Sequence, residues 1–172
     1  MNSEKNQSST ADCQLIWQLL EEVKDPEVPV LSIKELGVLR DVALEGENFL
    51  ITITPTYSGC PAMHAIEENI VEVLHQNKVE NFKIKTIFSP AWTTEWMTDV
   101  AKQKLKEYGI APPEKTTSDH LASMLLKKKT PVQCPFCSSN NTKLTSAFGS
   151  TACKALHYCN ACQQPFEEFK CH

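Results

Sequence analysis

Two Cys-x-x-Cys pairs constrain this chain more than any other feature of its sequence. The first, "CPFC", occupies residues 134–137, and the second, "CNAC", occupies residues 159–162. Each pair can place two thiolates on one metal ion from a tight turn, and four thiolates in a tetrahedron suit zinc. The β-prone runs "TKLTSAF" and "KALHYC" can form a hairpin that returns the second pair to the first. We therefore expect a closed C-terminal zinc ribbon with the ligands Cys134, Cys137, Cys159 and Cys162.

The spacing of these cysteines leaves other metals open. Iron in the same tetrathiolate, or an iron–sulfur cluster, uses the same ligands, and redox dithiols or disulfides are a third interpretation. Four protein ligands close a zinc site, so the expected zinc is structural and not catalytic. A second metal site could use Cys153, Cys171 and His172, although a free thiol and a tail that touches the ribbon explain these residues equally well.

Composition and charge limit the compartment and the partners. The 172 residues carry a net charge of −4, which argues against nucleic-acid binding as the main task. No apolar run approaches the roughly 20 residues of a membrane span, and the polar start "MNSEKNQSSTADCQ" does not resemble a signal peptide. We therefore expect a cytoplasmic protein without membrane contact. In a reducing compartment its eight cysteines are metal ligands or reactive thiols before disulfides.

Residues 11–110 have the pattern of a small mixed-sheet domain. An amphipathic helix ends at "DPEVP", residues 25–29, because proline terminates helices. Two β-rich runs flank a turn at residues 45–48, and a helix begins at "GCPA". The strand "NFKIKTIF" and a helix reaching about Tyr108 complete the pattern. The expected order is helix–strand–strand–helix–strand–helix, an α/β (α+β) fold with a separate C-terminal β zinc ribbon.

The rest of the chain divides by composition into a linker and the ribbon. Residues 111–131 contain two adjacent prolines and many polar residues, so we predict a linker in which residues 118–128 form a short helix. Residues 132–172 form the predicted ribbon. A segment of about 40 residues buries too little apolar surface to fold unaided. Metal binding is therefore expected to supply most of its folding energy.

Cys60 is the second candidate site. It precedes Pro61 at an expected helix start, where the helix dipole and nearby N–H groups would lower the pKa of its thiol. Thr54 and Thr56 offer hydroxyls, and His64 lies one turn further along the helix. Most lone buried cysteines are nevertheless small hydrophobic residues. A nucleophile–base pair of Cys60 and His64 lacks an identifiable orienting carboxylate.

Three strings in the first part of the chain, "DPEVP", "TPTYSGCPA" and "FSPAWTTEWM", resemble the SufT-like iron–sulfur assembly-factor domain. The string "FGSTACKALHYCNACQQPFEEFKCH" resembles the C-terminal part of PaaD-type subunits of phenylacetyl-CoA epoxidase systems. The resemblance covers residues 11–110 and 131–172. It implies a small α/β domain with a reactive cysteine in the "GCP" loop, here Cys60. It also implies zinc ligation by the four ribbon cysteines.

The resemblance implies a place in aerobic phenylacetate catabolism, where a multisubunit di-iron oxygenase epoxidises the ring of phenylacetyl-CoA. PaaD-type proteins accompany this complex as non-catalytic accessory subunits. Their proposed role is maturation, either loading an iron–sulfur cluster into the reductase subunit or assembling the oxygenase metal centre. In agreement with a non-catalytic role, the sequence lacks the two Glu-x-x-His motifs of di-iron bundles and a Gly-rich dinucleotide turn.

The expected cofactors are a structural zinc and a transient iron–sulfur cluster. One thiolate cannot hold a cluster, which requires four ligands. Cys60 would therefore act with a second copy in a homodimer, with Cys153 or Cys171, or with ligands on a client or donor protein. The alternative function is a structural adaptor, in which the ribbon and a surface containing Trp92 and Trp96 bridge epoxidase subunits.

Overall fold

The computed structural model describes residues 12–113 and 131–170. Between Trp92 and Thr93 the chain divides into two compact units, the N-terminal unit and the C-terminal unit. No helix among these residues is both long and apolar enough to cross a bilayer.

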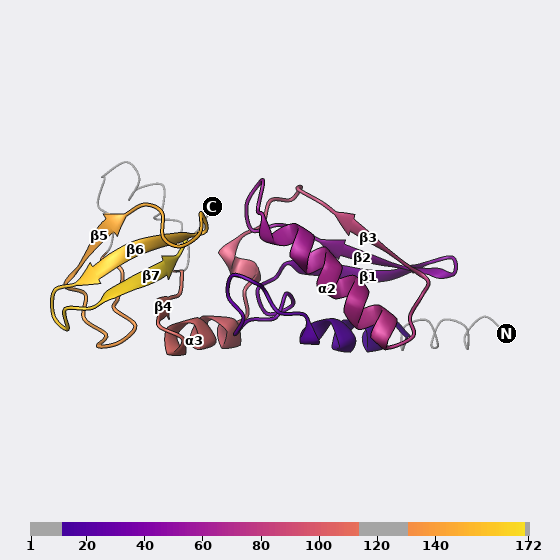
Figure 1. The fold of residues 1–172 in the computed structure, drawn as a ribbon, viewed down its shortest axis with the longest axis horizontal. Helices are drawn as coiled ribbons and strands as arrows, with labels where there is room; N and C mark the ends of the chain where they lie inside the picture. Colours follow the sequence, from indigo (N-terminus) through magenta and orange to yellow (C-terminus); the bar gives the residue numbers. More distant parts are fainter. Residues whose placement is uncertain (1–11, 114–130, 171–172) are drawn as a thin grey trace. The chain divides into compact units, whose positions relative to one another are not determined.

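The N-terminal unit is built on a three-stranded sheet with the strand order β1-β2-β3. Strands β1 and β2 are antiparallel, and β2 and β3 are parallel. Helix α2 makes the crossover between the two parallel strands and lies along one face of the sheet (Figure 1). The elements are a helix over residues 12–19, η1 (Leu20–Glu22), β1 (Leu39–Glu45), β2 (Asn48–Ile53), α2 (Ala62–Gln76) and β3 (Phe82–Thr86).

The core of this unit follows the apolar periodicity of the sequence. The α2 residues at four-residue spacing are 0–1% exposed, as are alternate residues of β2, because these spacings put side chains on one face of a helix or strand. These core residues are Ile66, Ile70, Leu74, Ile51 and Ile53. The expected order of helices and strands in this part of the chain is confirmed, including the turn between β1 and β2.

The C-terminal unit contains a four-stranded sheet with the order β4-β7-β6-β5. The pairs β5–β6 and β6–β7 are antiparallel, whereas β4 is parallel to β7. The hairpin expected from "TKLTSAF" and "KALHYC" is present as β5 and β6. The elements of the unit are η2 (Thr94–Trp96), α3 (Asp99–Glu107), β4 (Ile110–Ala111), β5 (Thr142–Ser146), β6 (Lys154–Cys159) and β7 (Pro165–Phe169).

Helix α3 groups with the ribbon, although the sequence pattern had joined it to the N-terminal domain. The reason is that β4, which follows α3 directly, pairs with β7. The predicted domain limits, 11–110 and 132–172 with a linker at 111–131, stay a prediction. The helix expected over residues 118–128 lies outside the described residues.

Candidate metal centre and thiol site

The four ribbon cysteines converge on one point. Their sulfur atoms all lie within 4.8 Å of one another. The Sγ atoms of Cys134 and Cys162 are 3.7 Å apart, and those of Cys137 and Cys159 are 3.6 Å apart. A tetrahedron with metal–sulfur bonds of about 2.3 Å has edges of about 3.8 Å. The geometry therefore fits a tetrathiolate metal site, and zinc and iron are the metals that prefer this soft donor set.

The two Cys-x-x-Cys turns have the same backbone geometry. In each, the residue after the second cysteine donates its N–H to the carbonyl oxygen of the first, at 2.9 Å, and adopts a left-handed φ near 60°. These residues are Ser138 and Gln163. A non-glycine residue in this region costs about 1–2 kcal/mol. The sequence offers no glycine signal here, so the strained positions could not be predicted from residue types.

The turns also aim backbone N–H groups at sulfur. The N–H groups of Cys162 and Ala161, together with the thiols of Cys137 and Cys162, outweigh burial and lower the pKa of the Cys159 thiol to about 7. Hydrogen bonds of this kind favour the thiolate, which is the form that ligates metal.

The metal site is buried on one side and open on the other. Cys134 and Cys159 are 0% exposed and pack with Ala111 and Phe166, whereas Cys137 is exposed. Four protein sulfurs leave no position for a substrate, so this arrangement has the chemistry of a structural site.

Cys60 lies in the loop before α2, and its thiol is half-buried. Burial has the largest effect on the pKa of this thiol and raises it, and the nearby carboxylates of Glu27 and Asp25 raise it further. Hydrogen bonds from the Ala62 N–H and the Thr56 hydroxyl lower the pKa but offset these effects only partly. The expected low pKa was therefore wrong. A single N–H from the first turn of α2 does not offset burial together with two carboxylates from a loop about 35 residues earlier in the sequence,.

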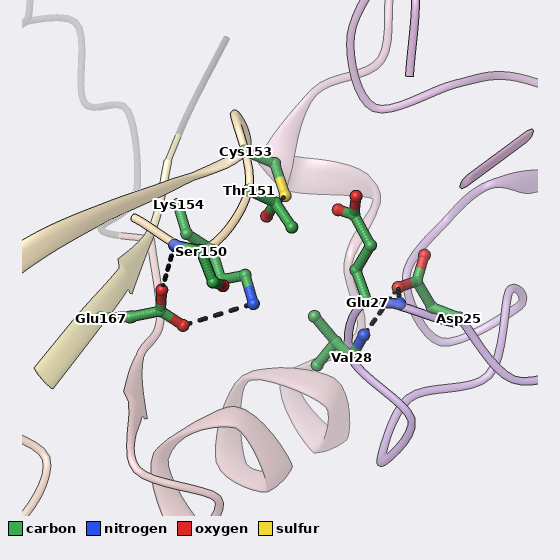
Figure 2. Close-up of polar contacts among 8 residues, drawn as sticks. All are labelled: Asp25, Glu27, Val28, Ser150, Thr151, Cys153, Lys154 and Glu167. Atoms are coloured by element: carbon green, nitrogen blue, oxygen red, sulfur yellow. Dashed lines mark hydrogen bonds and ion pairs between the residues drawn. The ribbon is translucent and has the colours of Figure 1, made fainter. Parts of the chain in front are cut away.

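Three other polar residues considered around Cys60 differ in burial and in hydrogen bonding. His64 is exposed, and its Nε2 lies 3.4 Å from Glu68 Oε1, an ordinary pair one helical turn apart. Asp25 is buried, and its Oδ1 accepts hydrogen bonds from the N–H groups of Glu27 and Val28, both at 2.8 Å (Figure 2). Thr54 is 1% exposed, and its hydroxyl has no hydrogen-bond partner among the described residues.

The raised pKa of Cys60 is testable through the charge of Glu27. We expect Glu27→Gln to lower the pKa of the thiol, because the substitution removes a carboxylate that disfavours the thiolate,. The rate of Cys60 alkylation by iodoacetamide, followed by mass spectrometry from about pH 6 to 10, should rise several-fold at about pH 7–8. Glu47→Gln, in the turn between β1 and β2, is the control and should leave the profile unchanged. Identical profiles in both variants would contradict the electrostatic account.

In the C-terminal unit, a second polar cluster holds the loop between β5 and β6. Glu167 accepts the N–H of Ser150 at 2.6 Å and pairs with the buried Lys154 at 3.3 Å (Figure 2). An ideal Cβ on Gly149 would lie 2.6 Å from Glu167 Oε1, so a side chain at this position would require the carboxylate to shift. The Thr151 hydroxyl lies 3.0 Å from the sulfur of buried Cys153. This loop has the distinctive "FGSTACK" sequence.

The second metal site that could use Cys153, Cys171 and His172 stays a prediction. Cys171 and His172 lie outside the described residues. The sequence has one Glu-x-x-His, at residues 72–75, but Glu72 accepts a hydrogen bond from Gln76 and His75 packs edge-on against Phe82. Among the described residues, the four ribbon cysteines are the only group of three or more with metal-binding spacing.

Comparison with known families matches both parts of the chain. Residues 118–170 match the PaaD zinc beta ribbon domain, and residues 14–83 match the iron–sulfur cluster assembly protein family. A solved structure of a domain of unknown function (DUF59) from Bacillus anthracis has a TM-score of 0.55 and 32% identity. The match covers 58% of this chain and 96% of the Bacillus anthracis chain.

One relative matches nearly the whole chain and another matches about half of it. "Cytosolic iron-sulfur assembly component 2B" of Dictyostelium discoideum is 32% identical over 91 residues, 51% of this chain and 55% of that protein. A putative 1,2-phenylacetyl-CoA epoxidase subunit of Escherichia coli (strain K12) is 46% identical over 156 residues, 91% of each chain. An iron–sulfur assembly domain joined to a PaaD-type zinc ribbon, with this identity along nearly the whole length, shows that the chain belongs to the PaaD-type family of phenylacetyl-CoA epoxidase subunits.

Proposed function

We propose that this protein is a non-catalytic accessory subunit of a phenylacetyl-CoA epoxidase system, and that it assists iron–sulfur cluster or metal-centre assembly through Cys60. The proposal places it in the cytoplasm, with the epoxidase subunits, including the iron–sulfur reductase, as partners. The observation that carries it is the environment of Cys60. This half-buried thiol lies under the influence of two carboxylates, on a domain that matches iron–sulfur cluster assembly proteins.

The surroundings of Cys60 suit the temporary binding of iron as cargo. Burial and the carboxylates of Glu27 and Asp25 keep the thiol protonated when no cation is present. An arriving iron cation is attracted by the same carboxylates and displaces the thiol proton, because the thiolate is the metal ligand. A cluster needs four ligands, so the donor, the client or a second copy of this chain supplies the rest. A site with so few ligands of its own can release its cargo.

The ribbon has a different task in this proposal. Its four sulfurs hold a resident zinc, which supplies folding energy to the C-terminal unit and takes no part in transfer. The ribbon then acts as the docking module that selects the client protein.

A purely structural adaptor is the second candidate function. It would use the ribbon and an exposed tryptophan surface to bridge epoxidase subunits, with Cys60 as a packing residue. Trp92 does not suit that surface, because it is 3% exposed and its indole N–H donates to the Leu36 carbonyl oxygen at 3.0 Å. The half-buried Trp96 is the tryptophan left for this role.

The test that separates the two functions is Cys60→Ser in cells that depend on the epoxidase. We expect the epoxidase complex to assemble normally but to contain several-fold less iron and to lose activity in proportion. The measurements are size-exclusion chromatography, iron and sulfide analysis of the purified complex, and epoxidase activity. Cys13→Ser is the matched control, since Cys13 is a half-buried free thiol in the same unit.

Each outcome assigns a function. Low iron in an intact complex, seen only with Cys60→Ser, supports maturation. Full iron content and activity with Cys60→Ser would leave the adaptor as the function of this protein. A complex that fails to assemble with Cys60→Ser, while Cys13→Ser behaves as wild type, would also contradict the proposed role of Cys60 as a transfer thiol.

A further inference from the structure

The segment between the two matched families has no assigned role. The family matches end at residue 83 and resume at residue 118. The described part of the gap includes α3 and β4, which belong to the C-terminal unit. Their contacts with the metal site indicate what the segment does.

Strand β4 extends the ribbon sheet. Ile110 pairs with Glu167 and Ala111 with Glu168, in parallel orientation. Both β4 side chains are at most 5% exposed. A two-residue strand makes too few backbone hydrogen bonds to stay paired by itself, so its position depends on what its side chains pack against.

Ala111 packs directly against the metal ligands. It is 1% exposed and forms one apolar cluster with Cys134, Cys159 and Phe166, against which Val132 and Cys162 also pack. Strand β4 therefore supplies one wall of the sulfur site, from a segment that precedes the first ligand by more than 20 residues. An apolar wall excludes water from metal–sulfur bonds.

A second contact joins the end of α3 to the first Cys-x-x-Cys turn. Gly109 follows α3 with a φ of +89°, and an ideal Cβ on it would lie 3.0 and 3.1 Å from the Cε1 and Cζ atoms of Phe136. Phe136 is the third residue of "CPFC", between two ligands. The ring therefore lies against glycine backbone. The positive φ disfavours a side chain at this position, and a new methyl group would also push against the tip of the Phe136 ring.

We propose that α3 and β4 are part of the metal-binding module, and that metal occupancy of the four-cysteine site determines whether they stay docked on the ribbon. Metal fixes the first turn and thereby the position of Phe136, and it fixes the packing of Cys134 and Cys159 that Ala111 completes. Without metal, four thiols within 4.8 Å have no common partner. The turn then loosens, and both contacts that hold the segment are lost.

Hydrogen exchange of the full-length protein tests the dependence on metal. We expect amide protection over residues 105–111 to fall at least tenfold when zinc is removed with a chelator, and to return when zinc is added back. Amides of Ile51 and Ile53 in the N-terminal unit are the internal reference and should not change. Equal protection of residues 105–111 with and without zinc would overturn the proposal.

Zinc release tests the same coupling in the other direction. We expect Gly109→Ala to speed transfer of zinc to a chromophoric chelator at least tenfold, because the new methyl group displaces the Phe136 ring. The matched control is Gly46→Ala, which has a similar φ of +66° but no atom within 4 Å of the new Cβ. It should release zinc at the wild-type rate.

Phe136→Ala keeps the experiment informative if Gly109→Ala does not fold. It removes the ring without straining the backbone and should also speed zinc release. The double variant Gly109→Ala/Phe136→Ala should release zinc more slowly than the product of the two single effects predicts, because the clash is gone. Wild-type release rates in Phe136→Ala would show that the segment does not support the metal site.

Discussion

Replacing Cys134 by serine is expected to remove zinc from the protein and to unfold the C-terminal unit while the N-terminal unit stays folded. Cys134 is 0% exposed and lies at the centre of the apolar cluster, and a serine hydroxyl is a poor substitute for a soft thiolate. Structural zinc contributes about 10–16 kcal/mol in small zinc modules. Elemental analysis after gel filtration should find about one zinc per chain in the wild type and close to none in the variant.

The controls for this experiment separate metal loss from general damage. Cys153→Ala changes a buried cysteine that lies in the β5–β6 loop of the same unit, and it should retain zinc. Near-ultraviolet circular dichroism and limited proteolysis should show disorder in the C-terminal unit of Cys134→Ser only. Full zinc content in Cys134→Ser would mean that the ligand set is wrong.

Loss of the Glu167 charge is expected to lower the free energy of unfolding of the C-terminal unit by about 2 kcal/mol, the second large effect. This value is smaller than the cost of breaking a fully buried ion pair. The reason for the smaller value is partial exposure, since the side chain of Lys154 is 6% exposed and that of Glu167 is 24% exposed. Although burial by itself raises the pKa of Glu167, the N–H of Ser150, its hydroxyl and the Lys154 ammonium lower it below the ordinary value. The carboxylate is therefore the stable form.

Two variants separate the contribution of the Glu167 charge to stability from that of its hydrogen bond. Glu167→Gln keeps an oxygen for the Ser150 N–H but loses the charge, whereas Glu167→Ala loses both and should be less stable by about another 1 kcal/mol. Urea unfolding of the zinc-loaded protein measures both. The control is Glu107→Gln, an exposed residue whose carboxylate accepts a hydrogen bond from Gln103, and it should change stability by less than about 0.5 kcal/mol. Equal stability of Glu167→Gln and Glu107→Gln would contradict a stabilising pair.

The sequence predicted those features that local residue patterns encode. Cys-x-x-Cys spacing is a local pattern, since both sulfurs of a pair come from one turn, and the sulfur atoms of the two pairs lie within 4.8 Å of one another. The order of helices and strands in the N-terminal unit followed from apolar periodicity and from proline and glycine positions. These signals act over a few residues, so a single sequence contains them in full.

The features that the sequence did not reveal depend on contacts between distant residues. The pKa of Cys60 is set partly by Asp25 and Glu27, which come close only in the folded domain. Strand β4 has two residues and no periodicity, and it exists because β7 lies beside it. The left-handed φ at Ser138 and Gln163 results from the geometry of the Cys-x-x-Cys turns and not from residue type.

The parallel pairing of β4 with β7 also affects the order in which the chain can fold during synthesis. The paired residues are 57 positions apart, so at roughly 5–20 residues per second β7 is made about 3–11 s after β4. The N-terminal unit, which is complete once Trp92 has left the ribosome, can fold during that interval. Ile110 and Ala111 remain unpaired during this interval. The ribbon forms late, because Cys162 and β7 are made almost together. All four sulfurs can therefore bind one zinc ion only after Cys162 has been made.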